Sequence, residues 1–233
     1  MLTISSFNIK NNYSQYTKEK ANQIITYLLD NKIDVLSLQE LFLLCEKDLV
    51  PFLHKHKYQL YGDYRFKWKL LDPMNEKTPI ITNKKVRSNQ TTHLPFFPSP
   101  IKRIATKVEI EDQELGLITI INTHLDYKFN FVKKRQLKTL LKLIEKEKNP
   151  LIITGDFNLK NNKEIFNDFI HSLEKLHIKR VELNDKTLKQ SKYHRAIDHI
   201  FISETFKVIS KEIKKDLPIS DHYPLLITIT KKN

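Results

Sequence analysis

Polar residues that could carry out chemistry recur where apolar segments of this sequence end. These ends are Asn8 (SFNIK), Gln39 and Glu40 (LSLQE), Asn122, His124 and Asp126 (INTHLD), Asp156 and Asn158 (TGDFN), Asp198 (RAIDHIF), and Ser220, Asp221 and His222 (SDHYP). A single Asn or Asp at such a place is usually an ordinary turn former. Repeated carboxylates, amides and imidazoles at the ends of apolar runs instead predict strand ends that converge on one site.

The residue types indicate hydrolysis at phosphorus. Hard cations such as Mg²⁺ prefer oxygen ligands, which Glu40, Asp156 and Asp221 could supply. Hydrolysis of a phosphate ester needs a nucleophilic water, stabilisation of charge on the phosphoryl oxygens and help for the leaving group. A cation and an amide stabilise charge, and His or Asp moves protons. We therefore predict a phosphoesterase that depends on a divalent metal.

The elements that must position these residues are mostly strands. The apolar runs predict strands at Leu2 to Phe7, Val35 to Leu38, Ile80 to Thr82, Ile104 to Ile110, Leu117 to Thr123, Leu151 to Thr154, Ile197 to Ile202 and Leu225 to Ile229. Helical periodicity predicts helices at Lys18 to Leu29, Phe131 to Ile144 and Lys163 to Leu176. The acids and glycine of EDQELG suit a hairpin turn. This pattern indicates two packed sheets with helices outside.

Alternation along a strand separates Asp198 from its neighbour His199. Successive side chains of a strand point to opposite faces, so only one of the two can face the site. We expect Asp198 to face the site and His199 to be structural.

Length and composition are those of one domain spanning residues 1–233. Hydrophobic residues make up 40% and charged residues 29% of the chain, which suits a sizeable core beneath a solvated surface. The three glycines form no phosphate-binding loop of the GxGxxG or Walker type, so phosphate must be handled by side chains and metal. The single cysteine, Cys45, excludes an internal disulfide and a cysteine-based zinc site.

The net charge and the N-terminal sequence are less specific evidence about function and location than the motifs are. The net charge of +13 favours polyanionic partners such as nucleic acid or an anionic membrane surface. An AT-rich genome would also produce a chain rich in Lys, Asn and Ile, so both explanations stay open. The N-terminal MLTISSFNIK resembles a strand and not a signal peptide, and no apolar run approaches the ~20 residues that span a bilayer. We expect a cytoplasmic protein without a transmembrane segment.

Taken together, the ordered motifs SFNIK, LQE, NTHLD, GDFN, AIDHIF and SDHYP closely resemble the endonuclease/exonuclease/phosphatase superfamily, which is DNase I-like. The resemblance covers nearly the whole chain. It implies an α/β fold, a four-layered α/β/β/α sandwich in which two mixed β-sheets pack face to face with helices outside. It also implies Mg²⁺ as cofactor, with Mn²⁺ as a possible substitute.

The resemblance implies a role for each matching residue. Glu40 matches the metal-binding Glu, Asn8 the Asn that supports the metal site, and Asp221 a neighbouring metal or outer carboxylate. Asp156 matches the Asp that orients or activates the attacking water, Asn158 the Asn that holds the phosphate, and His222 the His that contacts the phosphoryl group. Asp198 matches the acid that orients this His, His124 the His of DNase-like and sphingomyelinase-like branches, and Arg103 a phosphate-proximal Arg. TPIITNKKV departs from the family pattern, because Pro79 stands where small residues are usual.

Three hypotheses about the function remain. We favour a nuclease that cleaves DNA or RNA, with a phospholipid or inositol-phosphate phosphoesterase of the same superfamily as the alternative. A basic module that binds without catalysis is a third. For the nuclease, Lys133, Lys134 and Arg135 could reach a nucleic-acid backbone running past the site. Phe96 and Phe97, in a proline-rich stretch from Trp68 to Pro100, could be exposed for stacking on bases or for a lipid interface, but we favour their burial in the core of their own loop.

Overall fold

The computed structural model describes residues 1–10, 17–66, 75–159, 164–183, 185–189 and 196–232. Within these ranges the elements are β1 (Leu2–Asn8), α1 (Thr17–Asp30), β2 (Val35–Gln39), β3 (Leu41–Phe42), α2 (Leu43–Lys55), β4 (Gln59–Tyr61), β5 (Glu76–Lys77), β6 (Ile80–Thr82), β7 (Lys85–Leu94), β8 (Arg103–Asp112), β9 (Gly116–His124), α3 (Asn130–Ile144), β10 (Leu151–Asp156), α4 (Glu164–Lys175), β11 (Ile178–Arg180), β12 (Asp198–Ser203), β13 (Phe206–Ile213) and β14 (Leu225–Lys231). No helix in these ranges is long and apolar enough to cross a membrane.

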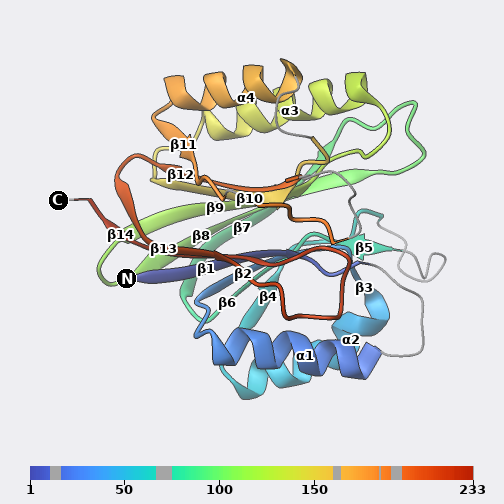
Figure 1. Cartoon of the computed structure of the whole chain (residues 1–233), viewed down its shortest axis with the longest axis vertical. Helices are drawn as coiled ribbons and strands as arrows, with labels where there is room; N and C mark the ends of the chain where they lie inside the picture. Colours follow the sequence, from blue (N-terminus) through green and yellow to red (C-terminus); the bar gives the residue numbers. More distant parts are fainter. Residues whose placement is uncertain (11–16, 67–74, 160–163, 184, 190–195, 233) are drawn as a thin grey trace.

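Two mixed sheets face each other at the centre of the molecule (Figure 1). In the described residues the first sheet has the strand order β13-β14-β1-β2-β6-β4 and the second has the order β11-β12-β10-β9-β8-β7. Helices α1 and α2 cover the outer face of the first sheet, and α3 and α4 cover the outer face of the second (Figure 1). The four-layered α/β/β/α sandwich is therefore confirmed.

Each predicted strand and helix has a counterpart within two residues of its predicted ends. The expected hairpin joins β8 to β9, with Asp112 opposite Gly116. The sequence did not predict α2, β7 or β13. Helix α2 contains Pro51 inside its span, which weakens the helical signal. Strands β7 and β13 lie at sheet edges and are largely exposed, so they lack the apolar alternation that marks a half-buried strand.

The layer between the two sheets is apolar at one end and polar at the other. Alternate residues of a strand share one face, and on this face apolar residues give way to polar ones as the strand proceeds. The sequence of buried residues is Leu2, Ile4, Ser6 and Asn8 on β1; Ile118, Ile120, Asn122 and His124 on β9; and Ile152, Thr154 and Asp156 on β10. The same alternation that builds the core therefore places the polar residues together at one end of it.

His199 lies on the other face of β12, as expected from its sequence position. Its ring packs against Phe166 of α4, with ring centroids 4.4 Å apart, and against Phe157 and Phe201. Burial lowers its pKa to about 4, so the imidazole is neutral at physiological pH. His199 belongs to the core beneath α4.

One amide joins the two sheets. Asn122 on β9 is fully buried, and its Nδ2 donates to the carbonyl oxygens of Leu38, at 2.8 Å, and Pro79, at 2.9 Å, in the opposite sheet. Its Oδ1 accepts a 2.7 Å hydrogen bond from Gln39 Nε2. Gln39 immediately precedes Glu40, so this contact fixes the end of β2 where the chain enters the polar layer.

We predict that Asn122→Ala destabilises the fold by about 2–4 kcal/mol, because two buried carbonyls lose their donor. For a chain of this size the melting temperature should fall by roughly 5–15 °C in a thermal scan. Asn89→Ala, at an exposed position of edge strand β7, is the matched control and should leave the melting temperature within about 1–2 °C of the parent. Equal stability of the two variants would contradict the assignment.

Candidate active site

The ends of strands from both sheets meet at the polar end of the sheet interface. β1 and β2 are parallel, with Asn8 opposite Gln39, and β9 and β10 are parallel, with His124 opposite Asp156. The antiparallel strand β12 adds Asp198 directly opposite Asp156. His222 enters from the connection before β14. Residues separated by more than 200 positions in the sequence are thus brought together.

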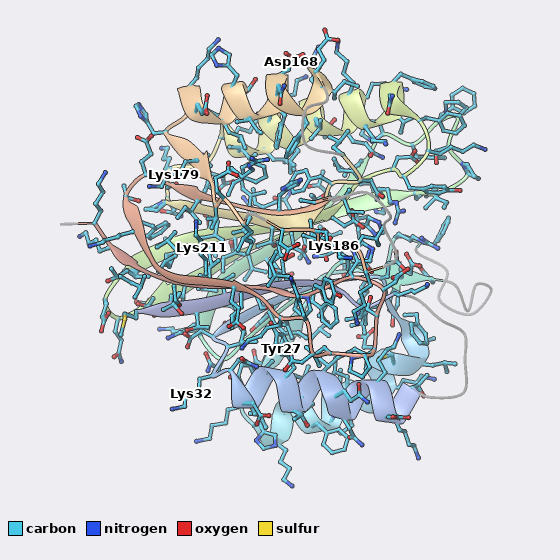
Figure 2. The ribbon with its side chains drawn as sticks, in the orientation of Figure 1. Tyr27, Lys32, Asp168, Lys179, Lys186 and Lys211 are labelled. Atoms are coloured by element: carbon cyan, nitrogen blue, oxygen red, sulfur yellow. The ribbon has the colours of Figure 1, made fainter. Side chains whose placement is uncertain are left out.

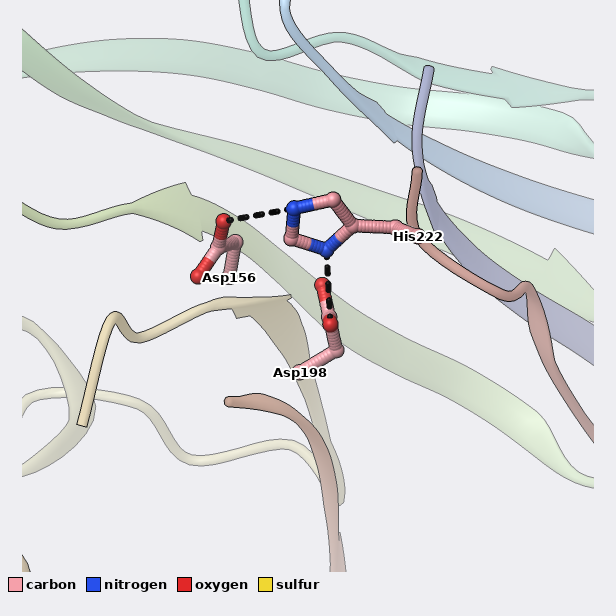
Figure 3. A group of neighbouring side chains, drawn as sticks. All are labelled: Asp156, Asp198 and His222. Atoms are coloured by element: carbon pink, nitrogen blue, oxygen red, sulfur yellow. Dashed lines mark hydrogen bonds and ion pairs between the residues drawn. The ribbon is translucent and has the colours of Figure 1, made fainter. Parts of the chain in front are cut away.

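A carboxylate and an imidazole form a buried pair in this cluster (Figure 3). His222 Nδ1 lies 2.9 Å from Asp198 Oδ2, and both side chains are buried. Burial alone would lower the pKa of His222, but Asp198 above all, with two further carboxylates nearby, raises it to about 10. The ring is therefore an imidazolium at neutral pH, with Nδ1–H held by Asp198 and Nε2–H directed toward Asp156, 3.9 Å from its Oδ2 (Figure 3).

Asp156 is the carboxylate on which the other side chains converge. Its Oδ1 accepts from the backbone N–H of Asn158 at 2.9 Å, and its Oδ2 accepts from Asn8 Nδ2 at 3.0 Å. His124 Nε2 lies 3.6 Å from the same Oδ2. Burial and the neighbouring charge of Asp198 raise the pKa of Asp156 to about 7. The group is poised to exchange a proton near neutral pH.

Gly155 allows the backbone before Asp156 to approach β9. Its φ of +154° disfavours other residues, and a Cβ added there would lie 2.1 Å from the carbonyl oxygen of Thr123. Only a residue without a side chain fits between the two strands. The glycine of the TGDFN motif thus sets the position of the carboxylate that follows it.

Asn8 links Asp156 to a second carboxylate, Glu40. Asn8 Nδ2 lies 3.2 Å from Glu40 Oε1, in addition to its contact with Asp156. Glu40 has a positive φ of 61° and is partly accessible to solvent, so the chain turns at the end of β2 to present it at the mouth of the cluster. The structure therefore brings together the carboxylates of Glu40 and Asp156, whose oxygens suit a hard cation, and the Asn8 amide that donates to both.

Asn158 lies at a turn immediately after β10. Its φ is 50°, a left-handed conformation that Asn tolerates better than most residues. Its Nδ2 donates to the carbonyl oxygen of Leu125 at 3.1 Å. This bond fixes the orientation of the amide, and it connects the GDFN loop to the loop that follows His124.

Arg103 fixes the tautomer of His124. Arg103 NH1 lies 2.8 Å from His124 Nδ1, and a guanidinium can only donate, so Nδ1 must accept. Burial, with the positive charges of Arg103 and His222, holds the pKa of His124 well below its usual 6.5. The imidazole is therefore neutral, and its Nε2–H points toward Asp156 Oδ2 and toward Glu40 Oε1, 3.9 Å away.

Asp221 does not join the central group. Its Oδ2 forms an ion pair with Lys10 Nζ at a distance of 2.8 Å, and the side chain of Asp221 is partly exposed. Its charge still contributes to the raised pKa of His222. Of the two roles that the resemblance implies for Asp221, this position suits an outer carboxylate better than a metal ligand.

Candidate metal ligands can be chosen in two ways. In the described residues, the ligand atoms of Asp156, Asp198 and His222 all lie within 4.8 Å of one another, so this buried group could hold a metal ion. Within this group, His222 Nδ1 and Asp198 Oδ2 are already hydrogen-bonded to each other. Glu40 and Asp156 form a second candidate pair, and the Asn8 amide donates to both of these carboxylates.

Two residues that support the site were given no specific role from the sequence: Ser220, which was noted only as part of a motif, and Glu76, which was not noted. Ser220 Oγ donates to the carbonyl oxygen of Asn8 at 2.6 Å and accepts from the backbone N–H of His222 at 3.1 Å, so it ties two motifs together. Its position in SDHYP was the available signal. Glu76 lies 3.9 Å from Arg103 and 2.8 Å from Arg65, in a segment without any recognisable motif.

Lys133 occupies a different place from the one expected. Its side chain is 3% exposed, and its Nζ donates to the carbonyl oxygens of Asn158, at 3.1 Å, and Tyr127, at 3.3 Å. The expectation that Lys133 reaches a passing nucleic-acid backbone is therefore wrong. The lysine instead holds the GDFN loop against the loop after β9, whereas Lys134 and Arg135 are exposed.

Comparisons with known proteins agree with this arrangement. The model of the Endonuclease/Exonuclease/phosphatase family matches residues 5–222. Among solved structures, the endonuclease/exonuclease/phosphatase from Bacteroides vulgatus is 22% identical, with 99% of each chain covered and a TM-score of 0.84. A mannosyl-6-phosphatase from Bacteroides thetaiotaomicron is 19% identical, covering 99% of this chain and 100% of that chain, with a TM-score of 0.79.

The catalytic domain of human Nocturnin, solved with a bound sulfate anion, is also 19% identical, covering 99% of this chain and 94% of that chain, with a TM-score of 0.79. At these identities the structural likeness establishes the fold alone. No curated protein matches the chain. Because the family model extends from the middle of β1 to His222 and so includes both ends of the polar cluster, the chain belongs to the endonuclease/exonuclease/phosphatase family of phosphoesterases.

Proposed function

We propose that this protein is a Mg²⁺-dependent phosphodiesterase that cleaves nucleic acid. The observation that carries the proposal is the position of Asp156, between the imidazolium of His222 and the neutral imidazole of His124. A carboxylate with a pKa of about 7 and an imidazolium held by a buried acid are the two proton-transfer groups that hydrolysis requires. Their joint presence argues against a module that only binds.

The side chains divide the work as follows. Asp156 accepts the proton of the attacking water, and His222 donates Nε2–H to the phosphoryl group as negative charge develops there. Asp198 keeps this imidazole protonated and oriented. Asn158 and the Nε2–H of His124 are donors for the phosphoryl oxygens, and Arg103 orients His124 from behind.

Glu40 and Asp156 would hold the cation, and Asn8 supports this site by donating to both carboxylates. When bound, Mg²⁺ supplies charge stabilisation at phosphorus and favours the ionised form of nearby acids. Two carboxylates separated by a shared amide hydrogen-bond donor fit an ion that prefers oxygen ligands. Mn²⁺, which accepts the same ligands, is expected to substitute.

Net charge alone does not identify the substrate. Figure 2 shows Lys32, Lys179 and Lys211 projecting from different layers of the molecule, so the positive charge is spread over the surface. Such a spread agrees with the genome-composition explanation. Support for nucleic acid instead comes from exposed cations beside the site, among them Lys128, Lys134 and Arg135. A phospholipid, an inositol phosphate or a sugar phosphate is the alternative that a substrate panel would reveal.

We predict that hydrolysis of bis(p-nitrophenyl) phosphate requires a divalent cation and is abolished by EDTA. Glu40→Gln should raise the Mg²⁺ concentration needed for half-maximal activity by at least about tenfold, because it removes one anionic ligand. Glu19→Gln, at an exposed position of α1, is the control and should not change the Mg²⁺ dependence. Full activity in EDTA would refute metal dependence.

Asp156→Asn should lower turnover by about 10²–10⁴-fold, because it removes the proton acceptor. The variant should be at least as stable as the parent without metal at neutral pH. The folded pKa of Asp156 is raised above its ordinary 3.8, so its ionisation destabilises the fold as pH rises through about 7, and Asn removes that penalty. Asp168→Asn on the exposed face of α4 is the control. A destabilised Asp156→Asn variant would indicate a structural role instead.

Asp198→Asn should move the alkaline limb of the kcat/KM profile from near pH 10 toward 6.5, the ordinary pKa of histidine, because the imidazolium of His222 loses its main partner. The sign follows from the raised pKa: His222 is protonated below its pKa, so activity that needs the imidazolium is lost as pH rises through that value. Asp216→Asn, an exposed substitution, should leave the profile unchanged. An unshifted limb in Asp198→Asn would show that the pair does not set the pH dependence.

A further inference from the structure

Exposed aromatic side chains gather beside the active site on two segments, the loop between β7 and β8 and the loop after β9 together with the first turn of α3. The described residues include five exposed aromatics, and four of them form what we call the aromatic rim: Phe96, Phe97, Tyr127 and Phe131, which are 38%, 75%, 56% and 51% exposed. The fifth, Phe52, lies on α2 in the opposite outer layer (Figure 1). Exposed aromatics are thus concentrated at one place, which is typical of a binding surface.

A network of buried polar groups joins the two loops of the rim. Asp126 is fully buried, and its Oδ1 accepts from the backbone N–H groups of Lys128, at 2.8 Å, and Phe129, at 2.7 Å. Its Oδ2 accepts from the hydroxyl of Ser99 on the other loop. Gln136 bridges both loops, since its Nε2 donates to the carbonyl oxygen of Pro95 at 2.9 Å and its Oε1 accepts from the backbone N–H of Asp126 at 2.8 Å.

The same network connects the rim to the site. Asn158 donates to the carbonyl oxygen of Leu125, and buried Lys133 donates to the carbonyl oxygens of both Asn158 and Tyr127. The aromatic side chains therefore stand on loops held in a fixed position relative to the group proposed to hold phosphate. A pre-organised surface loses little conformational entropy when a ligand binds.

The rim is also strongly basic. Residues 94–103 and 124–138 contain one acid, the buried Asp126, and five basic residues that reach the surface: Lys102, Lys128, Lys134, Arg135 and Lys138; Arg103 and Lys133 in these segments are buried. Lys102 Nζ lies 5.3 Å from the ring centre of Phe96, and Arg135 NH1 donates to the carbonyl oxygen of Phe97 at 3.3 Å. Flat apolar rings thus alternate with cations along the surface.

We propose that the aromatic rim binds a single-stranded segment of nucleic acid next to the scissile phosphate, with bases stacked on Phe97 and Phe131 and phosphates near Lys128 and Arg135. This inference rests on the proposed function, for which it specifies the strand state of the substrate. Stacking requires an open base face, which a single strand offers and the interior of a duplex does not. Cations close to the rings would neutralise the phosphates that accompany the stacked bases.

The apolar groups of the rim favour nucleic acid over a membrane surface. The three leucines of these two segments, Leu94, Leu125 and Leu137, are buried, and the exposed large hydrophobic residues within the two segments are all aromatic. Surfaces that enter the lipid interface commonly expose leucine together with aromatics and cations. Rings without exposed aliphatic side chains are better suited to stacking.

The test measures binding of a fluorescein-labelled single-stranded oligonucleotide by anisotropy in EDTA, where cleavage is suppressed. A Phe97→Ser/Phe131→Ser double variant should raise Kd about 10- to 100-fold, as expected for the loss of stacking on two rings. Phe97→Tyr/Phe131→Tyr should restore binding to within about threefold, because it restores both rings. Phe52→Ser is the matched exposed control and should not change Kd. Melting temperatures should be unchanged, since both Phe side chains are at least half exposed.

Other outcomes separate this inference from the proposed function. Unchanged oligonucleotide binding in the double Ser variant would overturn the inference. The inference would also be overturned if the double Ser variant lost binding to vesicles of phosphatidylserine and phosphatidylcholine but retained oligonucleotide binding. The rim would then be a membrane-binding surface. Hydrolysis of bis(p-nitrophenyl) phosphate with Mg²⁺ should be the same in parent and Ser variant, and its absence in the parent would refute the proposed activity independently of the binding result.

Discussion

Polar side chains that lie between two packed sheets must find partners within the protein, because water is largely excluded from that layer. An unpaired buried polar group costs about 1–3 kcal/mol. Asn122 meets this requirement by bonding two carbonyls of the opposite sheet and accepting from Gln39. The polar end of the interface is stable because such contacts cross from one sheet to the other, and the same contacts fix the strand ends that carry the site.

The exceptions to this pairing include two atoms at the site. In the described residues, Asp198 Oδ1 and Arg103 Nε are buried and have no hydrogen-bond partner. Buried polar atoms of this kind persist where a site is organised for something other than stability. Asp198 orients the imidazole of His222, and Arg103 orients the imidazole of His124. Each ring is held at its Nδ1 atom, and both Nε2 atoms face Asp156.

The two histidines have similar surroundings but different charge states: His222 is positively charged and His124 is neutral. Burial lowers the pKa of both imidazoles, but the carboxylate behind His222 reverses this effect and raises its pKa to about 10. Behind His124 burial is reinforced by the guanidinium of Arg103, so its pKa stays well below 6.5. One fold therefore provides an imidazolium and a neutral imidazole on either side of Asp156, which separates proton donation from neutral hydrogen bonding in space.

The sequence by itself determined the local features of this protein. Its apolar runs marked the interior strands, and the residue types at the ends of these runs marked the chemistry. The alternation of side chains along a strand placed Asp198 and His199 on opposite faces. These features depend on neighbours a few residues apart, so they can be read along the chain. Only the tertiary structure decided which distant residues pair: Asp221 with Lys10, Arg103 with His124, and Lys133 with the backbone of the GDFN loop. The exposure of Phe97 was also decided there. These contacts depend on the order of the strands in the sheets and on hydrogen bonds between loops at the strand ends. No periodicity in the sequence encodes them.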